Sequence, residues 1–225
     1  MSKNKPLSPE ELEKMYKKDD FSPHSLEKIL HDTKYNFESL KSAPFFGEET
    51  LGIYIDIMKK LAERKYAPAM YELGLFYYNG EWWKERDLEK SVLYHTLAAE
   101  LEYPDAMFEL YVLYSTGDGV ALDNKTALDW CKKAAFKGQT RACYNLGSFY
   151  ATGNGVEQDT VQSIEWYDKA SKGGHGKASA TLGVMYHLGQ EVKKDEGKAE
   201  KYFALSENQG FELDDFLLML GIDRK

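Results

Sequence analysis

The residues that first suggest chemistry form a glycine-rich turn, Gly-Asp-Gly at 117–119, inside the stretch YSTGDGVALDNKTALDW. Glycine backbones beside carboxylate and hydroxyl oxygens are typical of loops that hold a phosphate or a metal ion. A calcium loop needs an oxygen ligand at alternating positions, where this sequence has Val120 and Leu122. A phosphate-binding loop needs a lysine, which the related stretch GNGVEQD at 153–159 lacks. The pattern therefore favours a turn between two helices over a ligand site.

The other residue types that do chemistry are scattered along the chain. There is no GxSxG elbow, P-loop lysine motif, HExxH or GxGxxG pattern, and the five histidines show no ligand spacing. We therefore expect no metal and no cofactor. Because a nucleophile, a base and an orienting group cannot be assigned together, we expect no enzyme. The alternative that stays open is a hydrolase that uses carboxylates in a groove.

The chain has two cysteines, Cys131 and Cys143, which lie almost symmetrically about a predicted turn near Lys137-Gly138. They would approach each other if the two flanking helices packed antiparallel, so a disulfide is one alternative. In a reducing compartment the favoured interpretation is that both are small core residues.

The strongest signal is an internal repeat. The stretch AMYELGLFY at 69–77 recurs three times, as AMFELYVLY at 106–114, ACYNLGSFY at 142–150 and ASATLGVMY at 178–186. Its anchor leucines and a second series of aspartates keep one register, with steps of 36 or 37 residues: Leu73, Leu110, Leu146 and Leu182; Asp87, Asp123, Asp159 and Asp195. Two independent series with one period indicate stacked copies of one structural unit.

Each unit is predicted to be a pair of helices. In the first helix, apolar residues follow the i, i+4, i+7, i+8 spacing of an amphipathic helix. A glycine comes just after the last periodic residue, where a left-handed backbone ends a helix at low cost. The aspartate series then stands at the N-cap of the second helix, where a carboxylate accepts from exposed N–H groups. The glycines in question are Gly80, Gly117, Gly153 and Gly189.

The repeat resembles the Sel1-like repeat family, relatives of tetratricopeptide repeats. The resemblance is carried by RACYNLGSFYATGNGVEQDTVQSIEWYDKASKGG at 141–174 and DAMFELYVLYSTGDGVALDNKTALDWCKKAAFKGQ at 105–139. It implies an all-α fold, a right-handed α-solenoid of stacked helix-turn-helix units with helical caps. It also implies adaptor functions in protein complexes and, for some bacterial members, immunity or host interaction.

The predicted domain organisation has three parts. Residues 1–47 form N-terminal capping helices and a loop, residues 48–210 the repeat array, and residues 211–225 a C-terminal capping helix. Since one paired-helix unit cannot bury its apolar stripe alone, both ends of the array need covering. Within the array we expect a half unit at 48–66 and full units at about 67–103, 104–139, 140–175 and 176–210.

Composition narrows the class of partner. The net charge is −8 and the isoelectric point near 5.3, which argues against sequence-independent binding to nucleic acid. No signal segment opens the chain and no apolar run is long enough for a membrane span. We expect a cytoplasmic protein without a membrane partner, and the oligomeric state stays open.

A binding groove is predicted from the repeat register. If the array curves as tetratricopeptide arrays do, positions two before and two and five after each anchor leucine point into its concave face. An aromatic, uncharged stripe of this kind suits an extended segment or a helix of another protein. Framework packing is an equally weighted alternative for the aromatic residues two before the leucine. The candidate contact residues are Tyr71, Leu75, Tyr78, Phe108, Val112, Tyr144 and His187.

One unit departs from the pattern in its turn. Trp82-Trp83 stand where the next two units have Gly119-Val120 and Gly155-Val156. A tryptophan on a loop is either packed against the N-terminal segment or offered to a partner, and Trp82 is therefore an eighth candidate contact residue.

These observations lead to a functional hypothesis. We expect a non-catalytic scaffold that recognises a protein partner by its concave face and the Trp82 loop. A bacterial immunity protein that neutralises a toxic effector is one specific form, and a regulatory adaptor in a larger complex is the alternative.

Overall fold

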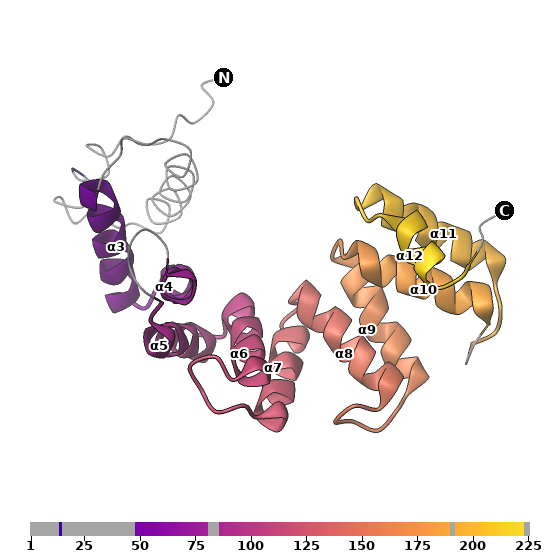
Figure 1. Cartoon of the computed structure of the whole chain (residues 1–225), viewed down its shortest axis with the longest axis horizontal. Helices are drawn as coiled ribbons and strands as arrows, with labels where there is room; N and C mark the ends of the chain where they lie inside the picture. The colour runs from indigo at the N-terminus through magenta and orange to yellow at the C-terminus, as the bar shows by residue number, and fades with distance from the viewer. Residues whose placement is uncertain (1–13, 15–47, 81–85, 190–191, 223–225) are drawn as a thin grey trace, which may run out of the picture. The chain divides into compact units, whose positions relative to one another are not determined.

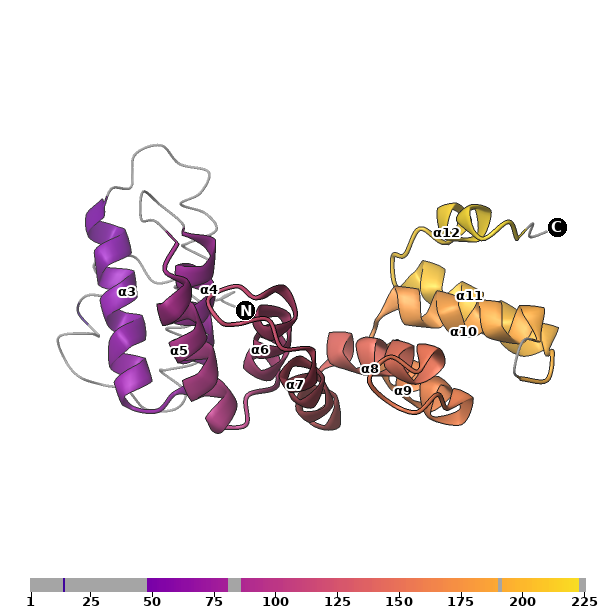
Figure 2. The ribbon, with the colours of Figure 1, turned by 60° about the horizontal axis from the view of Figure 1, so that its bottom comes forward.

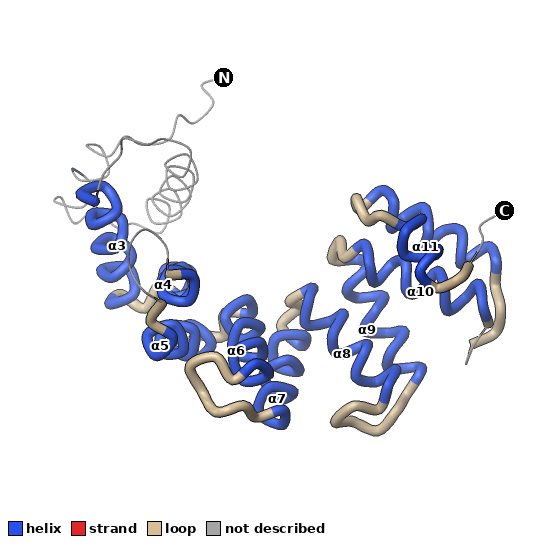
Figure 3. Tube along the Cα trace, in the orientation of Figure 1, coloured by secondary structure: helices blue, strands red, loops and turns tan. Residues whose placement is uncertain are grey.

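The computed structural model describes Lys14 and residues 48–80, 86–189 and 192–222. These residues form helices joined by turns, with no β-strand among them (Figure 3). The predicted all-α solenoid is confirmed. No helix of the described ranges is both long and apolar enough to cross a membrane.

The chain divides into two compact units, residues 1–101 and 102–225. The described helices of the first unit are α3 (Glu48–Glu63), α4 (Ala67–Asn79) and α5 (Leu88–Glu100). Helix α4 packs against both α3 and α5. The predicted capping helices and loop of residues 1–47 lie outside the described residues, and so does Trp82.

The described helices of the second unit form three pairs followed by a short helix (Figures 1 and 2). Within each pair the two helices lie side by side, and α7 also packs on α8 and α9 on α10. The helices are α6 (Pro104–Thr116), α7 (Asn124–Phe136), α8 (Thr140–Thr152), α9 (Thr160–Lys172), α10 (Gly176–Leu188), α11 (Glu196–Asn208) and α12 (Leu213–Met219).

The aspartate series caps the second helices, as predicted. Asp123 accepts from the backbone N–H groups of Lys125 and Thr126, while Asp159 accepts from Gln162 and Asp195 from Lys198. Asp87 does the same for Lys90 in the first unit. These bonds satisfy N–H groups that have no partner inside the helix.

The glycine-rich stretch at 117–119 is a turn. Gly117 ends α6 in the left-handed region at φ 78°, and its N–H donates to Leu113 O at 2.9 Å. The N–H of Asp123 then returns to Tyr114 O at 3.0 Å. The same backbone pattern closes the other repeats, where the acceptors are Tyr77, Tyr150 and Tyr186. The turn recurs in each repeat because the chain must reverse its direction between the two helices of a pair.

The core follows the repeat register. The anchor leucines are 0–1% exposed, and the alanines four residues before them are fully buried. Because alanine adds little volume, neighbouring helices approach closely there. The residues concerned are Leu73, Leu110, Leu146 and Leu182, and Ala69, Ala106, Ala142 and Ala178.

In three repeats an aromatic ring of the second helix lies directly against a glycine of the first. A Cβ added to Gly147 would lie 2.8 Å from Tyr167 Cδ1, and one added to Gly183 would lie 2.4 Å from Phe203 Cδ1. Gly74 has the same relation to the imidazole of His95. These glycines are required by the space that the ring occupies.

The second repeat reverses this arrangement. It has Tyr111 on the first helix in place of the glycine, and Cys131 on the second helix in place of the ring. The ring of Tyr111 lies 5.4 Å from that of Phe108, which matches the 5.4 Å between Tyr144 and Tyr167 in the third repeat. Tyr167 reaches across its helix pair to Gly147 and Tyr144, whereas the half-buried Tyr111 lies beside Phe108 of its own helix, so the ring of this position pair comes from opposite helices in the two repeats.

Candidate protein-interaction surface

On α4, the three candidate contact residues Tyr71, Leu75 and Tyr78 are all half-buried. The ring of Tyr71 lies 5.7 Å from that of His95, so it is partly framework. The Arg86 guanidinium lies 4.7 Å from the Tyr78 ring, and its Nε donates to Tyr78 O at 2.8 Å. Tyr78 is thus held in place beside a cation.

On α6, Phe108 and Val112 differ in accessibility. Phe108 is 5% exposed, and the guanidinium of Arg141 from α8 covers its ring at 4.3 Å. Phe108 therefore packs as part of the framework, which is one of the two roles that the sequence left open for it. Val112 is half-buried, and its carbonyl accepts from the Ser115 hydroxyl at 2.9 Å.

Tyr144 on α8 is the most strongly positioned of the candidates. Its half-buried ring stacks on His175 at 4.5 Å with an interplanar angle of 12°. His175 is fixed in turn, because its Nδ1 accepts from the Ala178 N–H at 3.2 Å. The ammonium of Lys177 lies 5.7 Å from the Tyr144 ring. We call Tyr144, His175 and Lys177 the Tyr144 cluster.

His187 on α10 contacts its own repeat and none of the other candidates in the described ranges. Its Nδ1 lies 2.9 Å from Glu196 Oε2, and Lys194 Nζ lies 2.8 Å from the other oxygen of that carboxylate. Hydrogen bonds from Lys194 and then His187 lower the pKa of Glu196. The imidazole is 29% exposed, so part of it remains accessible.

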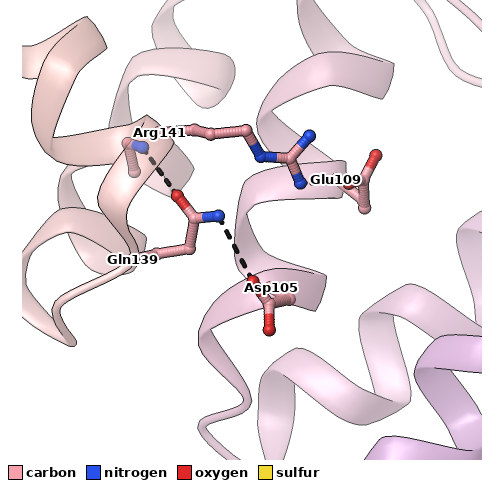
Figure 4. A network of polar contacts seen from close by, with 5 residues as sticks. Asp105, Glu109, Gln139 and Arg141 are labelled. Carbon is pink, nitrogen blue, oxygen red and sulfur yellow. Dashed lines mark hydrogen bonds and ion pairs between the residues drawn. The ribbon is translucent and has the colours of Figure 1, made fainter. Parts of the chain in front are cut away.

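A polar network joins α6 to the start of α8, and sequence reasoning missed it. Figure 4 shows Gln139 between the two helices, with Nε2 donating to Asp105 Oδ1 at 3.2 Å. Its Oε1 accepts from the Ala142 N–H at 2.7 Å. Arg141 Nη2 also bonds Glu109 Oε1 at 3.0 Å. The sequence feature that could have indicated this network is the position five residues before each anchor leucine. This position is Asp105 in one repeat and the oppositely charged Arg141 in the next.

This network engages both carboxylates of α6, Asp105 and Glu109. Burial raises the pKa of Glu109, although Arg141 opposes that rise. Both carboxylates hold neighbouring helices together, since Asp105 is bonded to Gln139 and Glu109 to Arg141. Across the described ranges, no three His, Cys, Asp or Glu side chains gather as a metal site would require.

The two cysteines are buried core residues with free thiols, as the favoured interpretation predicted. Cys131 Sγ lies 3.6 Å from Ala142 O, and Cys143 Sγ lies 3.5 Å from Ala135 O. Burial raises the pKa of Cys131 to about 12 and also raises that of Cys143. Both thiols are protonated at neutral pH, which makes them poor nucleophiles.

Solved structures with the same fold include a Sel1 repeat protein from Oxalobacter formigenes. It is 26% identical with a TM-score of 0.70, over 87% of this chain and 78% of that one. A protective antigen present in uropathogenic Escherichia coli strains is 28% identical with a TM-score of 0.74; the match covers 97% of this chain but 46% of the antigen. An immunity protein from Pseudomonas aeruginosa, 16% identical with a TM-score of 0.55, shares the fold over 95% of this chain and 90% of its own.

The sequence model of the Sel1 repeat matches four consecutive segments, residues 67–103, 104–138, 140–175 and 177–211. These segments cover more than half of the chain. Sel1 repeat proteins are generally non-catalytic scaffolds for protein–protein interaction. This chain belongs to the Sel1 repeat family.

Proposed function

We propose that this protein is a non-catalytic scaffold that binds a protein partner through the partly exposed faces of its first helices. The observation that carries the proposal is the Tyr144 cluster. A half-exposed tyrosine stacked at 4.5 Å on a histidine that is itself hydrogen-bonded offers contact area whose conformation is already restricted. Rigid aromatic side chains dominate binding energy at protein interfaces for this reason.

The proposed contact residues are half-buried candidates of the first helices: Tyr71, Leu75 and Tyr78 in the first unit, and Val112, Tyr144 and His187 in the second. Phe108 is left out of this set because it is 5% exposed and covered by Arg141. Trp82 lies outside the described residues and stays a prediction as an additional contact.

The surface is tested by capture of a partner from native lysate with the tagged protein and identification by mass spectrometry. Tyr144→Ala should weaken capture at least about tenfold, the loss expected for a hot-spot aromatic. Tyr150→Ala is the matched control, because it removes a half-buried tyrosine from the same helix outside the candidate positions. Equal capture by Tyr144→Ala and the unmodified protein would reject this surface.

The finer proposal is that the partner is a toxic effector and the protein its immunity factor. Support comes from the acidic charge of −8 and from the immunity proteins reported in the Sel1-like family. A purified cognate effector should lose activity at a one-to-one molar ratio with the protein. An effector that stays active at excess protein would reject the immunity role and favour a regulatory adaptor.

A further inference from the structure

A hollow of about 390 Å³ lies in the second unit, where the second and third repeats of the chain meet. This volume is within the range of roughly 300–1,000 Å³ that is typical of ligand pockets. Its lining comes from α6, α7, α8 and the turn after α8, and it includes one predicted groove position, Ser115, which lies five residues after Leu110. The lining residues used below are Tyr111, Ser115, Lys125, Leu128, Phe149 and Asn154.

Two aromatic rings form the walls of this hollow. Tyr111 of α6 and Phe149 of α8 meet edge to face, with centroids 6.3 Å apart and an interplanar angle of 83°. Tyr111 is the residue that replaces the glycine of the other repeats, so this wall exists only in the second repeat. The ring exchange between Tyr111 and Cys131 thereby adds an aromatic surface at this junction.

The floor is apolar and closely packed. It is formed by Ala127 and Leu128 of α7, which are 2% and 8% exposed. A Cβ added to Gly155 would lie 3.0 Å from Leu128 Cδ2, so the backbone of that turn sits tightly against the leucine.

The mouth is polar and carries one positive charge. Asn154 and Lys125 are exposed at its edge. Lys125 Nζ makes no ion pair with any carboxylate of the described ranges. The adjacent Asp123 carboxylate accepts from two backbone N–H groups and from the Thr126 hydroxyl at 2.7 Å, and it also interacts electrostatically with Lys125. The Ser115 hydroxyl is likewise engaged, with Val112 O at 2.9 Å.

We propose that this hollow is an anchor site for an aromatic side chain of the protein partner, with a carboxylate beside the ring held by Lys125. Aromatic rings favour edge-to-face contact with other rings, which the two walls provide. The single positive charge at the mouth is complementary to a carboxylate. The inference rests on the proposed protein-binding function and adds the chemistry of the group that is bound.

The site is tested with small probes, so that the test needs no identified partner. N-acetyl-tyrosine carries a free carboxylate, and N-acetyl-tyrosinamide is its neutral counterpart. In ¹H–¹⁵N correlation spectra of the full chain, N-acetyl-tyrosine should shift the amides of Tyr111, Asn154 and Gly155 in a saturable manner. N-acetyl-tyrosinamide should bind about twofold to fivefold more weakly, because an exposed ion pair contributes little.

Matched variants separate this site from other surfaces. Ser115→Phe should fill the hollow and abolish the shifts. Ala151→Phe places the same ring at the equivalent position of the third repeat and should leave them unchanged. Lys125→Gln should remove the preference for the acid over the amide. If Ser115→Phe does not fold, Asn154→Trp at the exposed mouth replaces it.

Two outcomes would overturn the proposal. The first is no saturable shift at Tyr111, Asn154 and Gly155, and the second is an unchanged shift in the variant whose hollow is blocked. Either result leaves the scaffold function intact, since partner capture through Tyr144 is measured separately. Loss of capture in Tyr144→Ala with normal probe binding would likewise show two independent surfaces.

Discussion

At one pair of equivalent positions, the second and third repeats carry an aromatic ring on opposite helices. In the third, Tyr167 of α9 lies against Gly147 of α8. In the second, Tyr111 of α6 supplies the ring and Cys131 of α7 takes the small position. Packing in a protein core requires that volume is filled without overlap, and either helix can supply it. The exchange also has an external consequence, because Tyr111 borders the proposed anchor site.

The largest expected effect comes from removing the ring of the third repeat. Tyr167→Cys deletes a 5% exposed ring and leaves a cavity beside Gly147, so the free energy of unfolding should fall by about 3–5 kcal/mol. Urea unfolding followed by circular dichroism measures this. Tyr167→Phe keeps the ring, as Phe203 does in the fourth repeat, and loses only the hydroxyl that hydrogen-bonds Ser148, so it should cost about 0.5–1.5 kcal/mol. Similar losses for both variants would contradict the packing role of the ring.

In the first repeat, the ring at the position of Tyr167 is the titratable imidazole of His95. His95 is 1% exposed, its Nδ1 has no hydrogen-bond partner among described atoms, and burial lowers its pKa from 6.5 to about 4. The neutral imidazole is favoured in the folded state. Stability should therefore be full above pH 6.5 and fall as the pH drops from 6.5 towards 4, by up to about 3 kcal/mol.

This dependence is measured by urea unfolding at a series of pH values. His95→Phe places in the first repeat the ring that the fourth already has, and it should remove the His95 contribution to the loss between pH 6.5 and 4. An unchanged pH profile in His95→Phe would show that other groups cause the loss.

The arrangement of the second repeat, with the ring on the first helix and a cysteine on the second, can be introduced into the third repeat by mutation. Gly147→Tyr alone overlaps the Tyr167 ring and should destabilise by about 1–3 kcal/mol. Combined with Tyr167→Cys it reproduces the second repeat, so the double variant should lose less than the sum of the single losses, with a coupling of about 1–3 kcal/mol. Additive losses in this double-mutant cycle would mean that the two repeats differ in more than the origin of the ring.

The smallest expected effect on stability concerns the N-cap aspartates of the second and third repeats. The Asp123 carboxylate accepts from two backbone N–H groups, whereas that of Asp159 accepts from one. Asp123→Ala should lower Tm by on the order of 2–4 °C, and Asp159→Ala should lower it less. Thermal unfolding followed by circular dichroism compares them, and a larger shift for Asp159→Ala would contradict the role of the second bond.

Much of the fold was predictable, because it depends on interactions between neighbours in sequence. The period of 36 or 37 residues, the left-handed glycines and the aspartate caps each follow from local backbone chemistry. The candidate surface was less predictable. The second and third repeats both have an aromatic residue two positions before the anchor leucine, yet Phe108 is 5% exposed while Tyr144 is half-buried. The difference arises from the neighbouring repeat, where Arg141 lies over one ring and Lys177 lies further from the other.

The sequence by itself determined the all-α repeat architecture, the helix ends and the absence of a recognisable catalytic motif, since these depend on residue type and spacing along the chain. Only the tertiary structure decided that the Tyr111 ring meets Phe149 of the next repeat and that Gln139 links α6 to α8. It also decided that a hollow lies between two repeats. Each of these depends on side chains roughly 20 to 40 residues apart, whose contacts are set by how the helices pack.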